Sequence, residues 1–126
     1  MKQVLLIDDD RDDAELFKEA LWEINSSIAF EHYDDSKTGL SVLLDKHTGL
    51  PDVIFLDINM PIVSGWQCLA EFKKTDHLRH IPVIMFTTSS QDREREIAKE
   101  LGADGFITKP SEYKALKELI SSVVNN

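Results

Sequence analysis

Residues 52–57 read Asp-Val-Ile-Phe-Leu-Asp, four consecutive large apolar residues closed by a carboxylate. A short, continuous apolar run of this kind is typical of a parallel β-strand that is buried on both faces. Met60 and Pro61 follow closely, so the predicted strand ends in a turn. A carboxylate at the end of such a strand needs a physical reason, because burying an ionised group without a partner is costly.

Similar segments recur along the whole chain. We expect five strands, at residues 3–8, 28–33, 52–57, 82–87 and 105–108. The segments between them carry apolar residues at three- and four-residue spacing, as the buried face of a helix does, and the helix expected at 91–101 has the thinnest apolar stripe. This alternation predicts an α/β fold, a doubly wound (βα)5 unit with a five-stranded parallel sheet.

Length and composition limit the function. The chain has 126 residues, so we expect one domain over 1–126, with no room for a second catalytic or DNA-binding domain. Its formal charge of −9 disfavours binding to nucleic acid or to an anionic membrane. A single cysteine, Cys68, cannot form an internal disulfide, and no signal peptide precedes the first strand, so we expect a cytoplasmic protein.

Polar residues close the predicted strands. Asp8 and Asp9 end the first strand, Asp57 the third, Thr87 the fourth and Lys109 follows the fifth. In an open parallel sheet this edge is where ligands bind. Carboxylates ~4 Å apart repel by about 4 kcal/mol at an effective dielectric near 20, and one lysine cannot neutralise three of them. Oxygen ligands of this kind predict a site for a hard divalent cation, Mg²⁺ first.

These residue types suit phosphoryl transfer. Carboxylate-bound Mg²⁺ is used where a phosphoryl group must be oriented and its charge neutralised. The Thr87 hydroxyl and the Lys109 ammonium can each bind a phosphoryl oxygen. Asp57 is then left as an oxygen nucleophile that can form an acyl phosphate.

Four motifs in sequence order resemble a known family, the receiver domain of two-component response regulators in its stand-alone form. The motifs are Ile7-Asp8-Asp9, the run from Asp57 to Pro61 with Gly65 four residues beyond, Thr87, and Lys109-Pro110. The resemblance spans essentially the whole chain. It implies a flavodoxin-like sheet of order 2-1-3-4-5.

The resemblance assigns a role to each acid. Asp57 accepts a phosphoryl group from a phosphohistidine of a sensor histidine kinase or of a histidine phosphotransfer protein. Asp9, Asp57 and the main-chain oxygen of Asn59 bind Mg²⁺, and Asp8 acts through water. Phosphorylation and water-mediated dephosphorylation are then reactions of the protein on itself, without an external metabolic substrate, so it is not an enzyme in the metabolic sense.

The resemblance also implies a conformational switch. Thr87 and Lys109 bind the phosphoryl oxygens, and the movement of Thr87 is coupled to an aromatic residue on the fifth strand, here Phe106. Many relatives carry Tyr at that position, so a hydrogen bond from the Tyr hydroxyl is absent here. Thr88 stands where Ala or Gly is common, and we expect it to narrow access to the site and to slow dephosphorylation.

The output surface implied by the family comprises the fourth helix, the fifth strand and the fifth helix. In this sequence it covers residues 93–99, Phe106 and residues 114–118, which carry charges of both signs. Such a surface can serve an unknown target protein or a second copy of the chain, so a homodimer is possible.

Other functions fit the residues less well. A phosphohydrolase of the haloacid dehalogenase type also uses a strand-end Asp, Thr, Lys and Mg²⁺, but it normally has a second Asp where this chain has Asn59. A dinucleotide or flavin domain would require a glycine-rich turn after a strand, and no Gly-x-Gly-x-x-Gly follows any strand. A receiver-like interaction module that is never phosphorylated stays open.

Residues around these motifs receive simpler interpretations. Asp10, Asp12 and Asp13 are expected to be solvated surface, or to favour the positive end of the first helix. Ser64 is expected to cap the third helix.

Overall fold

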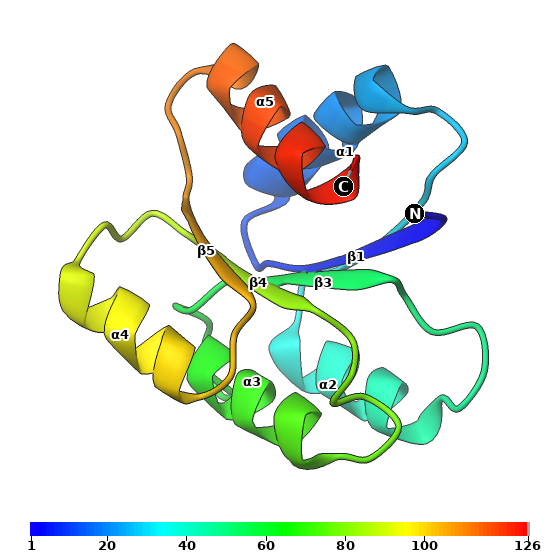
Figure 1. Cartoon of the computed structure of the whole chain (residues 1–126), viewed down its shortest axis with the longest axis vertical. Coiled ribbons are helices and arrows are strands. Elements are labelled where there is room, and N and C mark those ends of the chain that lie inside the picture. Colours follow the sequence, from blue (N-terminus) through cyan, green and yellow to red (C-terminus); the bar gives the residue numbers. More distant parts are fainter. Residues whose placement is uncertain (126) are drawn as a thin grey trace.

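The computed structural model describes residues 1–125, in which five strands and five helices alternate (Figure 1). They are β1 (Gln3–Ile7), α1 (Arg11–Ile24), β2 (Ala29–Tyr33), α2 (Ser36–Asp45), β3 (Val53–Leu56), α3 (Gly65–Lys74), β4 (Val83–Thr87), α4 (Asp92–Glu100), β5 (Gly105–Thr108) and α5 (Tyr113–Val124). The five predicted strands are all present. Four of them are one or two residues shorter than predicted, because flanking residues such as Asp8 and Asp57 lie outside the regular ladder.

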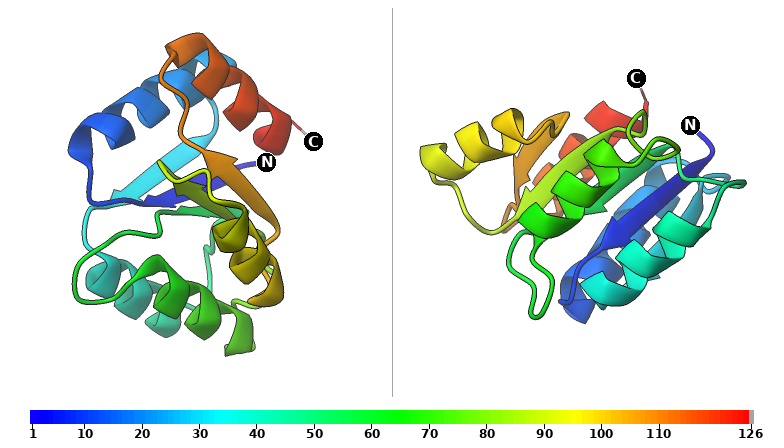
Figure 2. Two further views of the ribbon diagram at one scale, coloured as in Figure 1. Left: turned by 90° about the vertical axis from the view of Figure 1, so that its left-hand side faces the viewer. Right: turned by 90° about the horizontal axis from the view of Figure 1, so that it is seen from below.

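All strands are parallel, in the order β2-β1-β3-β4-β5. Helices α1 and α5 cover one face of the sheet, and α2, α3 and α4 cover the other (Figures 1 and 2). This arrangement confirms the predicted doubly wound, flavodoxin-like α/β fold.

The core is fully packed around the central strands. In β3 all four residues are completely buried, and Val4 to Ile7 of β1 are at most 1% exposed. On the α1 face the ring of Phe17 packs edge-on against Phe55 and Phe86, with ring centroids 4.8 and 5.5 Å apart. Each buried aromatic side chain contributes about 1.5–3 kcal/mol, so this cluster fixes α1 firmly over the sheet centre.

The β5 edge of the sheet is packed more loosely. Ile107 is buried, whereas the other three residues of β5 are only half-buried. Helix α4 buries a single residue, Ala98, as its thin apolar stripe predicted. Within residues 1–125, none of the helices combines the length and the apolar character needed to cross a membrane.

Candidate functional site

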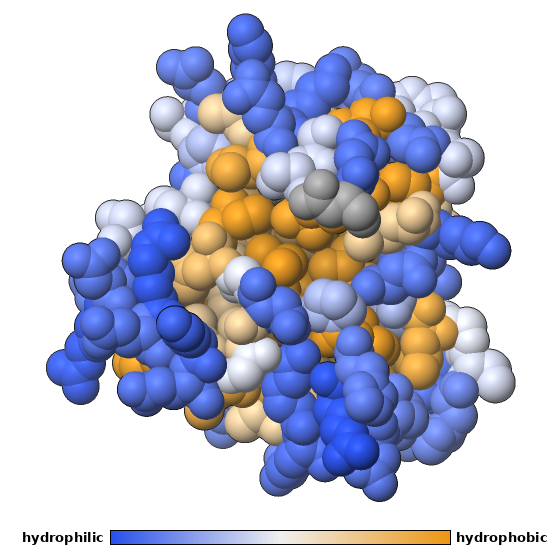
Figure 3. All heavy atoms as spheres, in the orientation of Figure 1, coloured by the Kyte–Doolittle hydropathy of each residue, from blue (hydrophilic) through white to orange (hydrophobic). Residues whose placement is uncertain are grey.

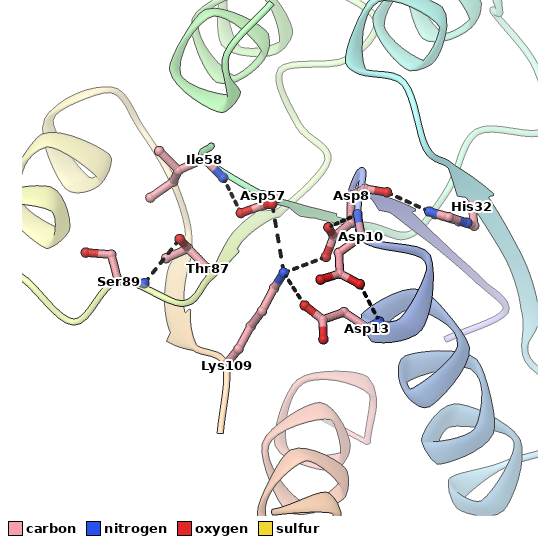
Figure 4. A network of polar contacts seen from close by, with 9 residues as sticks. All are labelled: Asp8, Asp10, Asp13, His32, Asp57, Ile58, Thr87, Ser89 and Lys109. Atoms are coloured by element: carbon pink, nitrogen blue, oxygen red, sulfur yellow. Dashed lines mark hydrogen bonds and ion pairs between the residues drawn. The ribbon is translucent and has the colours of Figure 1, made fainter. Parts of the chain in front are cut away.

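The carboxyl ends of the strands bring four of the predicted residues to one edge of the sheet, namely Asp8, Asp57, Thr87 and Lys109 (Figure 4). Asp57 follows β3, and its N–H donates to the carbonyl of Ile7 at 3.0 Å. Lys109 follows β5, and its N–H donates to the carbonyl of Thr87 at 2.6 Å. Because these backbone bonds lie one residue beyond the regular ladders, they hold the side chains that follow the strands at the same level.

Three carboxylates lie within reach of a single ion. Each of Asp8, Asp9 and Asp57 offers an oxygen, and these oxygens lie within 4.8 Å of one another. Asp8 is completely buried and Asp57 is 6% exposed. Within residues 1–125, Asp8 Oδ2 receives no hydrogen bond of good geometry and relies on an ion pair. Buried, undersatisfied carboxylate oxygens fit a hard divalent cation.

The pKa shifts of the buried carboxyls also favour a cation at this cluster. Burial raises the pKa of Asp57 to about 7; the charges of Asp8 and Asp9 add to this, while Lys109 and the N–H of Ile58 oppose it. Burial also raises the pKa of Asp8, although Lys109 counteracts it. The two buried carboxyls therefore resist joint ionisation, a cost that a divalent cation would relieve.

Lys109 is the positive charge at the centre of the cluster. Its Nζ lies 2.8 Å from Asp8 Oδ2, 2.9 Å from Asp13 Oδ2 and 3.8 Å from Asp57 Oδ2. The ammonium also sits over the ring of Phe86, 5.2 Å from its centroid. Burial alone would lower the pKa of Lys109, but the carboxylates of Asp13 and Asp8 outweigh burial and raise it, so the side chain stays protonated.

At the start of α1, Asp10 and Asp12 are exposed as predicted, whereas the expectation for Asp13 needs a correction. Asp10 is the N-cap of α1, and its side chain accepts a hydrogen bond from the N–H of Asp13. The N–H of Asp10 in turn donates to Asp8 Oδ1 at 2.9 Å. Asp13 is not merely solvated, because it pairs with Lys109, whereas Asp12 is exposed as predicted. The alternative that these acids favour the positive helix end holds for Asp12 and Asp13, which lie in the first turn.

The loop after Asp57 is closely fitted to it. A Cβ on Gly65 would lie 2.1 Å from the main-chain oxygen of Asp57, so only glycine allows α3 to start here. Ser64 caps α3 in a capping box with Gln67, which confirms the prediction for Ser64. In the same loop Ile62 is 84% exposed and has a φ of 69°, a left-handed conformation that is strained for a β-branched residue.

Two further predicted residues lie on β4 and just beyond it. Thr87 is completely buried, and its Oγ1 accepts a hydrogen bond from the N–H of Ser89 at 3.4 Å. Thr88 follows and is exposed. Asn59 is also exposed, two residues after Asp57.

Phe106 lies at the loosely packed β5 edge, and Arg95, for which the sequence predicted no individual role, covers its ring. The guanidinium of Arg95 on α4 stacks on the half-buried ring of Phe106, 4.7 Å from its centroid. Arg95 also donates to Thr108 Oγ1 at 3.1 Å, and Thr108 donates to the carbonyl of Ser89. Residue spacing cannot predict this contact, because Arg95 lies on α4 and Phe106 on β5, and their distance depends on how the two elements pack.

Comparison with known proteins places this site in a family. Residues 4–121 match the family model of the response regulator receiver domain. The chain is 36% identical over 123 residues to the chemotaxis protein CheY of Halobacterium salinarum, covering 98% of this chain and 97% of that protein. It is 30% identical over 127 residues to the polar-differentiation response regulator DivK of Brucella anthropi, covering 99% and 98%.

Solved structures agree. The phosphorylated cyanobacterial phytochrome response regulator RcpA is similar with a TM-score of 0.89 and 26% identity, over 97% of this chain and 90% of that chain. The Mn²⁺-bound form of response regulator Rcp1 is similar with a TM-score of 0.82 and 29% identity, over 98% and 91%. Fold, sequence and the order of the strand-end motifs coincide, and the chain belongs to the response regulator receiver domain family.

Proposed function

We propose that this protein is a phosphorelay response regulator that accepts a phosphoryl group on Asp57. The observation that carries the proposal is the state of that carboxylate. Asp57 is nearly buried among like charges, yet its Oδ2 lies 3.8 Å from Lys109 Nζ, too far for a direct hydrogen bond. A carboxylate that is neither solvated nor firmly paired is suited to act as a nucleophile.

The transfer step needs a phosphohistidine donor on a sensor histidine kinase or a histidine phosphotransfer protein. An Asp57 carboxylate oxygen attacks the phosphorus, the phosphorus–nitrogen bond breaks, and the imidazole leaves with the electron pair. Lys109 and Thr87 receive the phosphoryl oxygens, the lysine by charge and the threonine by its hydroxyl. Dephosphorylation is attack of water on the same phosphorus, which releases inorganic phosphate and restores the Asp57 carboxylate.

We propose Mg²⁺ as the cation of the acidic cluster, held by Asp9, Asp57 and the main-chain oxygen of Asn59, with Asp8 acting through water. When bound, the ion neutralises charge on the transferring phosphoryl group and orients it. The carboxylate donor set supports a hard cation, and the Mn²⁺-bound relative Rcp1 supports an ion in this family. The raised pKa of Asp57, about 7, means that cation binding and ionisation of Asp57 reinforce each other.

The signal leaves through the β5 edge in this proposal. Thr87 is drawn toward the phosphoryl group, and Phe106 moves into the space that Thr87 leaves. Arg95, which now covers the ring, must release Phe106 for that movement. The surface of α4, β5 and α5 then changes for a target protein or for a second copy of the chain.

Thr88 is the proposed modulator of access. It is exposed directly after the buried Thr87, with a β-branched side chain beside the phosphoacceptor edge. A bulky side chain there restricts the approach of hydrolytic water and lengthens the life of the phosphoryl group.

We further propose that residues 1–126 form one receiver domain, and that the protein works in the cytoplasm and binds neither nucleic acid nor membrane. Its net charge of −9 supports the last two points.

Intact mass after incubation with acetyl phosphate and Mg²⁺ tests the proposed function. We expect a gain of one phosphoryl group that is lost in Asp57→Asn and in the presence of EDTA. Asp12→Asn is the matched control, because it removes an exposed acid nearby and should leave phosphorylation intact. Phosphorylation that persists in Asp57→Asn would refute the assignment, and a wild-type protein that takes up no phosphoryl group would favour a binding module.

A further inference from the structure

Asp13 lies at the site but has no role in the proposed phosphoryl transfer or cation binding. It belongs neither to the three carboxylates that lie within reach of one ion nor to the groups that bind phosphoryl oxygens. Yet its Oδ2 lies 2.9 Å from Lys109 Nζ, as close as Asp8 and about an ångström closer than Asp57. The lysine side chain is only 9% exposed and that of Asp13 is 32% exposed, so this contact is partly shielded from water.

The contact directs the lysine. An ammonium has three N–H donors, and Asp13 Oδ2 accepts a hydrogen bond from one of them at 2.9 Å. Asp8 Oδ2 forms an ion pair with the same Nζ at 2.8 Å. Figure 4 shows Asp13 reaching Nζ from α1, on the side away from Asp57. Asp13 therefore holds the positive charge of Lys109 away from Asp57, and N–H groups of the ammonium remain available for a further oxygen.

Asp13 is well anchored for this task. Its N–H donates to the side chain of the N-cap Asp10, and Asp10 donates through its own N–H to Asp8. The following residue, Ala14, is buried on the face that α1 packs against the sheet. The carboxylate thus projects from a rigid first helical turn rather than from a flexible loop.

We propose that Asp13 is a positioning residue of the phosphoacceptor site. It holds the Lys109 ammonium away from Asp57, which keeps an Asp57 oxygen available to the phosphoryl group and leaves a lysine N–H free to donate to a phosphoryl oxygen. The inference rests on the proposed function. Within residues 1–125, removal of the Asp13 carboxylate leaves Asp8 and Asp57 as the carboxylate partners of Lys109, which then competes with a divalent cation for both.

Calorimetric titration of the whole protein with Mg²⁺ reads this competition directly. In Asp13→Asn, Mg²⁺ should bind about tenfold more weakly, the equivalent of one charge-assisted hydrogen bond shifted onto the ligands. Asp13→Glu keeps the carboxylate and should recover most of the affinity. Asp12→Asn removes the same charge from the same helical turn without touching Lys109 and should bind Mg²⁺ as the wild type does.

A double-mutant cycle separates a route through Lys109 from the plain loss of a nearby charge. In a Lys109→Met background, where the competing ammonium is absent, Asp13→Asn should leave the Mg²⁺ affinity unchanged. Equal effects of Asp13→Asn and Asp12→Asn, an unchanged affinity in Asp13→Asn, or an equal loss with and without Lys109 would each overturn the inference.

Phosphorylation provides the second measurement. At a Mg²⁺ concentration that half-saturates the wild type, Asp13→Asn should gain the phosphoryl group from acetyl phosphate at least about fivefold more slowly, because a tenfold weaker affinity lowers its Mg²⁺ occupancy by that factor and lysine positioning is lost as well. A wild-type protein that binds Mg²⁺ but is never phosphorylated would refute the proposed function, while the affinity comparison would still test the control of Lys109 by Asp13.

Discussion

The centre of the sheet and its β5 edge are built in opposite ways. At the centre, β1 and β3 are almost wholly inaccessible to solvent, and Lys109 forms short ion pairs with Asp8 and Asp13 beside them. At the edge, β5 is largely half-buried, and α4 buries only Ala98. Figure 3 shows hydrophilic side chains over the region of α4, which lies at the left in Figure 1.

This difference in packing suggests a division of roles, in which the centre holds the reacting groups and the β5 edge changes conformation. A fixed centre holds reacting groups in place, since close packing admits only discrete rearrangements. A loosely packed edge opens at a lower free energy and can change its population of conformations when the centre gains charge. Arg95 links α4 to β5 at this edge, because its guanidinium stacks on Phe106 and donates to Thr108.

The largest expected effect follows from removing the central charge. Lys109→Met leaves the buried Asp8 and the nearby Asp13 without a cation and should destabilise the fold by about 3 kcal/mol at pH 8. The loss should shrink at pH 5, where carboxyls with raised pKa take up protons. Urea unfolding measures it, with Lys117→Met as the control, because that half-exposed lysine pairs with Glu23 at the surface. Equal losses of unfolding free energy in the two variants would show that the charge of Lys109 contributes no more to stability than a surface lysine does.

Removing the phosphoacceptor charge should do the opposite. The pKa of Asp57 is raised from an ordinary 3.8 to about 7, so between these values the folded chain holds more protons than the unfolded chain, and stability falls as pH rises. In metal-free buffer, Asp57→Asn should be roughly 2 kcal/mol more stable than the wild type at pH 8, with the gain vanishing near pH 4. Identical urea midpoints at pH 8 would contradict the electrostatic account of the cluster.

Backbone strain beside the centre gives a smaller effect. Ile62→Gly relieves the left-handed conformation and should stabilise the protein by about 1 kcal/mol, after the greater unfolded-state entropy of glycine is deducted. Ile62→Val keeps the β-branch and the strain, so it should leave the free energy of unfolding unchanged. If the two variants have the same urea midpoint, the strain carries no measurable energy.

The edge should respond locally. Arg95→Ala removes the stacking on Phe106 and should cost about 0.5–1 kcal/mol, the range for an exposed cation–π contact. Amide exchange should accelerate in α4 and β5 while β1 and β3 stay protected. Arg93→Ala, on the same helix and also exposed, lacks the ring contact and is the matched control. Faster exchange spread over all strands would contradict an independent edge.

Thr88 lies in the segment that joins the centre to the edge, and its effect is on rate alone. Thr88→Ala should let water approach more easily and speed the decay of phosphorylated Asp57, with unchanged stability. Ser90→Ala alters another exposed residue of the same segment and should leave the decay as in the wild type. Mass spectrometry over time after removal of the phosphoryl donor measures the dephosphorylation rate of both variants. An unchanged rate in Thr88→Ala would contradict the proposed role of Thr88 in limiting access of water.

The sequence predicts the centre better than the edge for a physical reason. Continuous apolar runs mark β1, β3 and β4, and the parallel topology then places Asp8, Asp57 and Lys109 at one level. The pairing of Asp13 with Lys109 depends on how α1 leaves β1, which the Asp10 cap determines in three dimensions. The stacking of Arg95 on Phe106 likewise depends on the angle of α4, and no periodic pattern encodes that angle.

Amide hydrogen exchange of the whole protein with acetyl phosphate and Mg²⁺, wild type beside Asp57→Asn, tests the central claim most directly. We predict that phosphorylation changes exchange in α4 and β5, leaves β1 and β3 protected, and has no such effect in Asp57→Asn. Unchanged exchange in α4 and β5 of fully phosphorylated protein, or the same change in Asp57→Asn, would contradict the account.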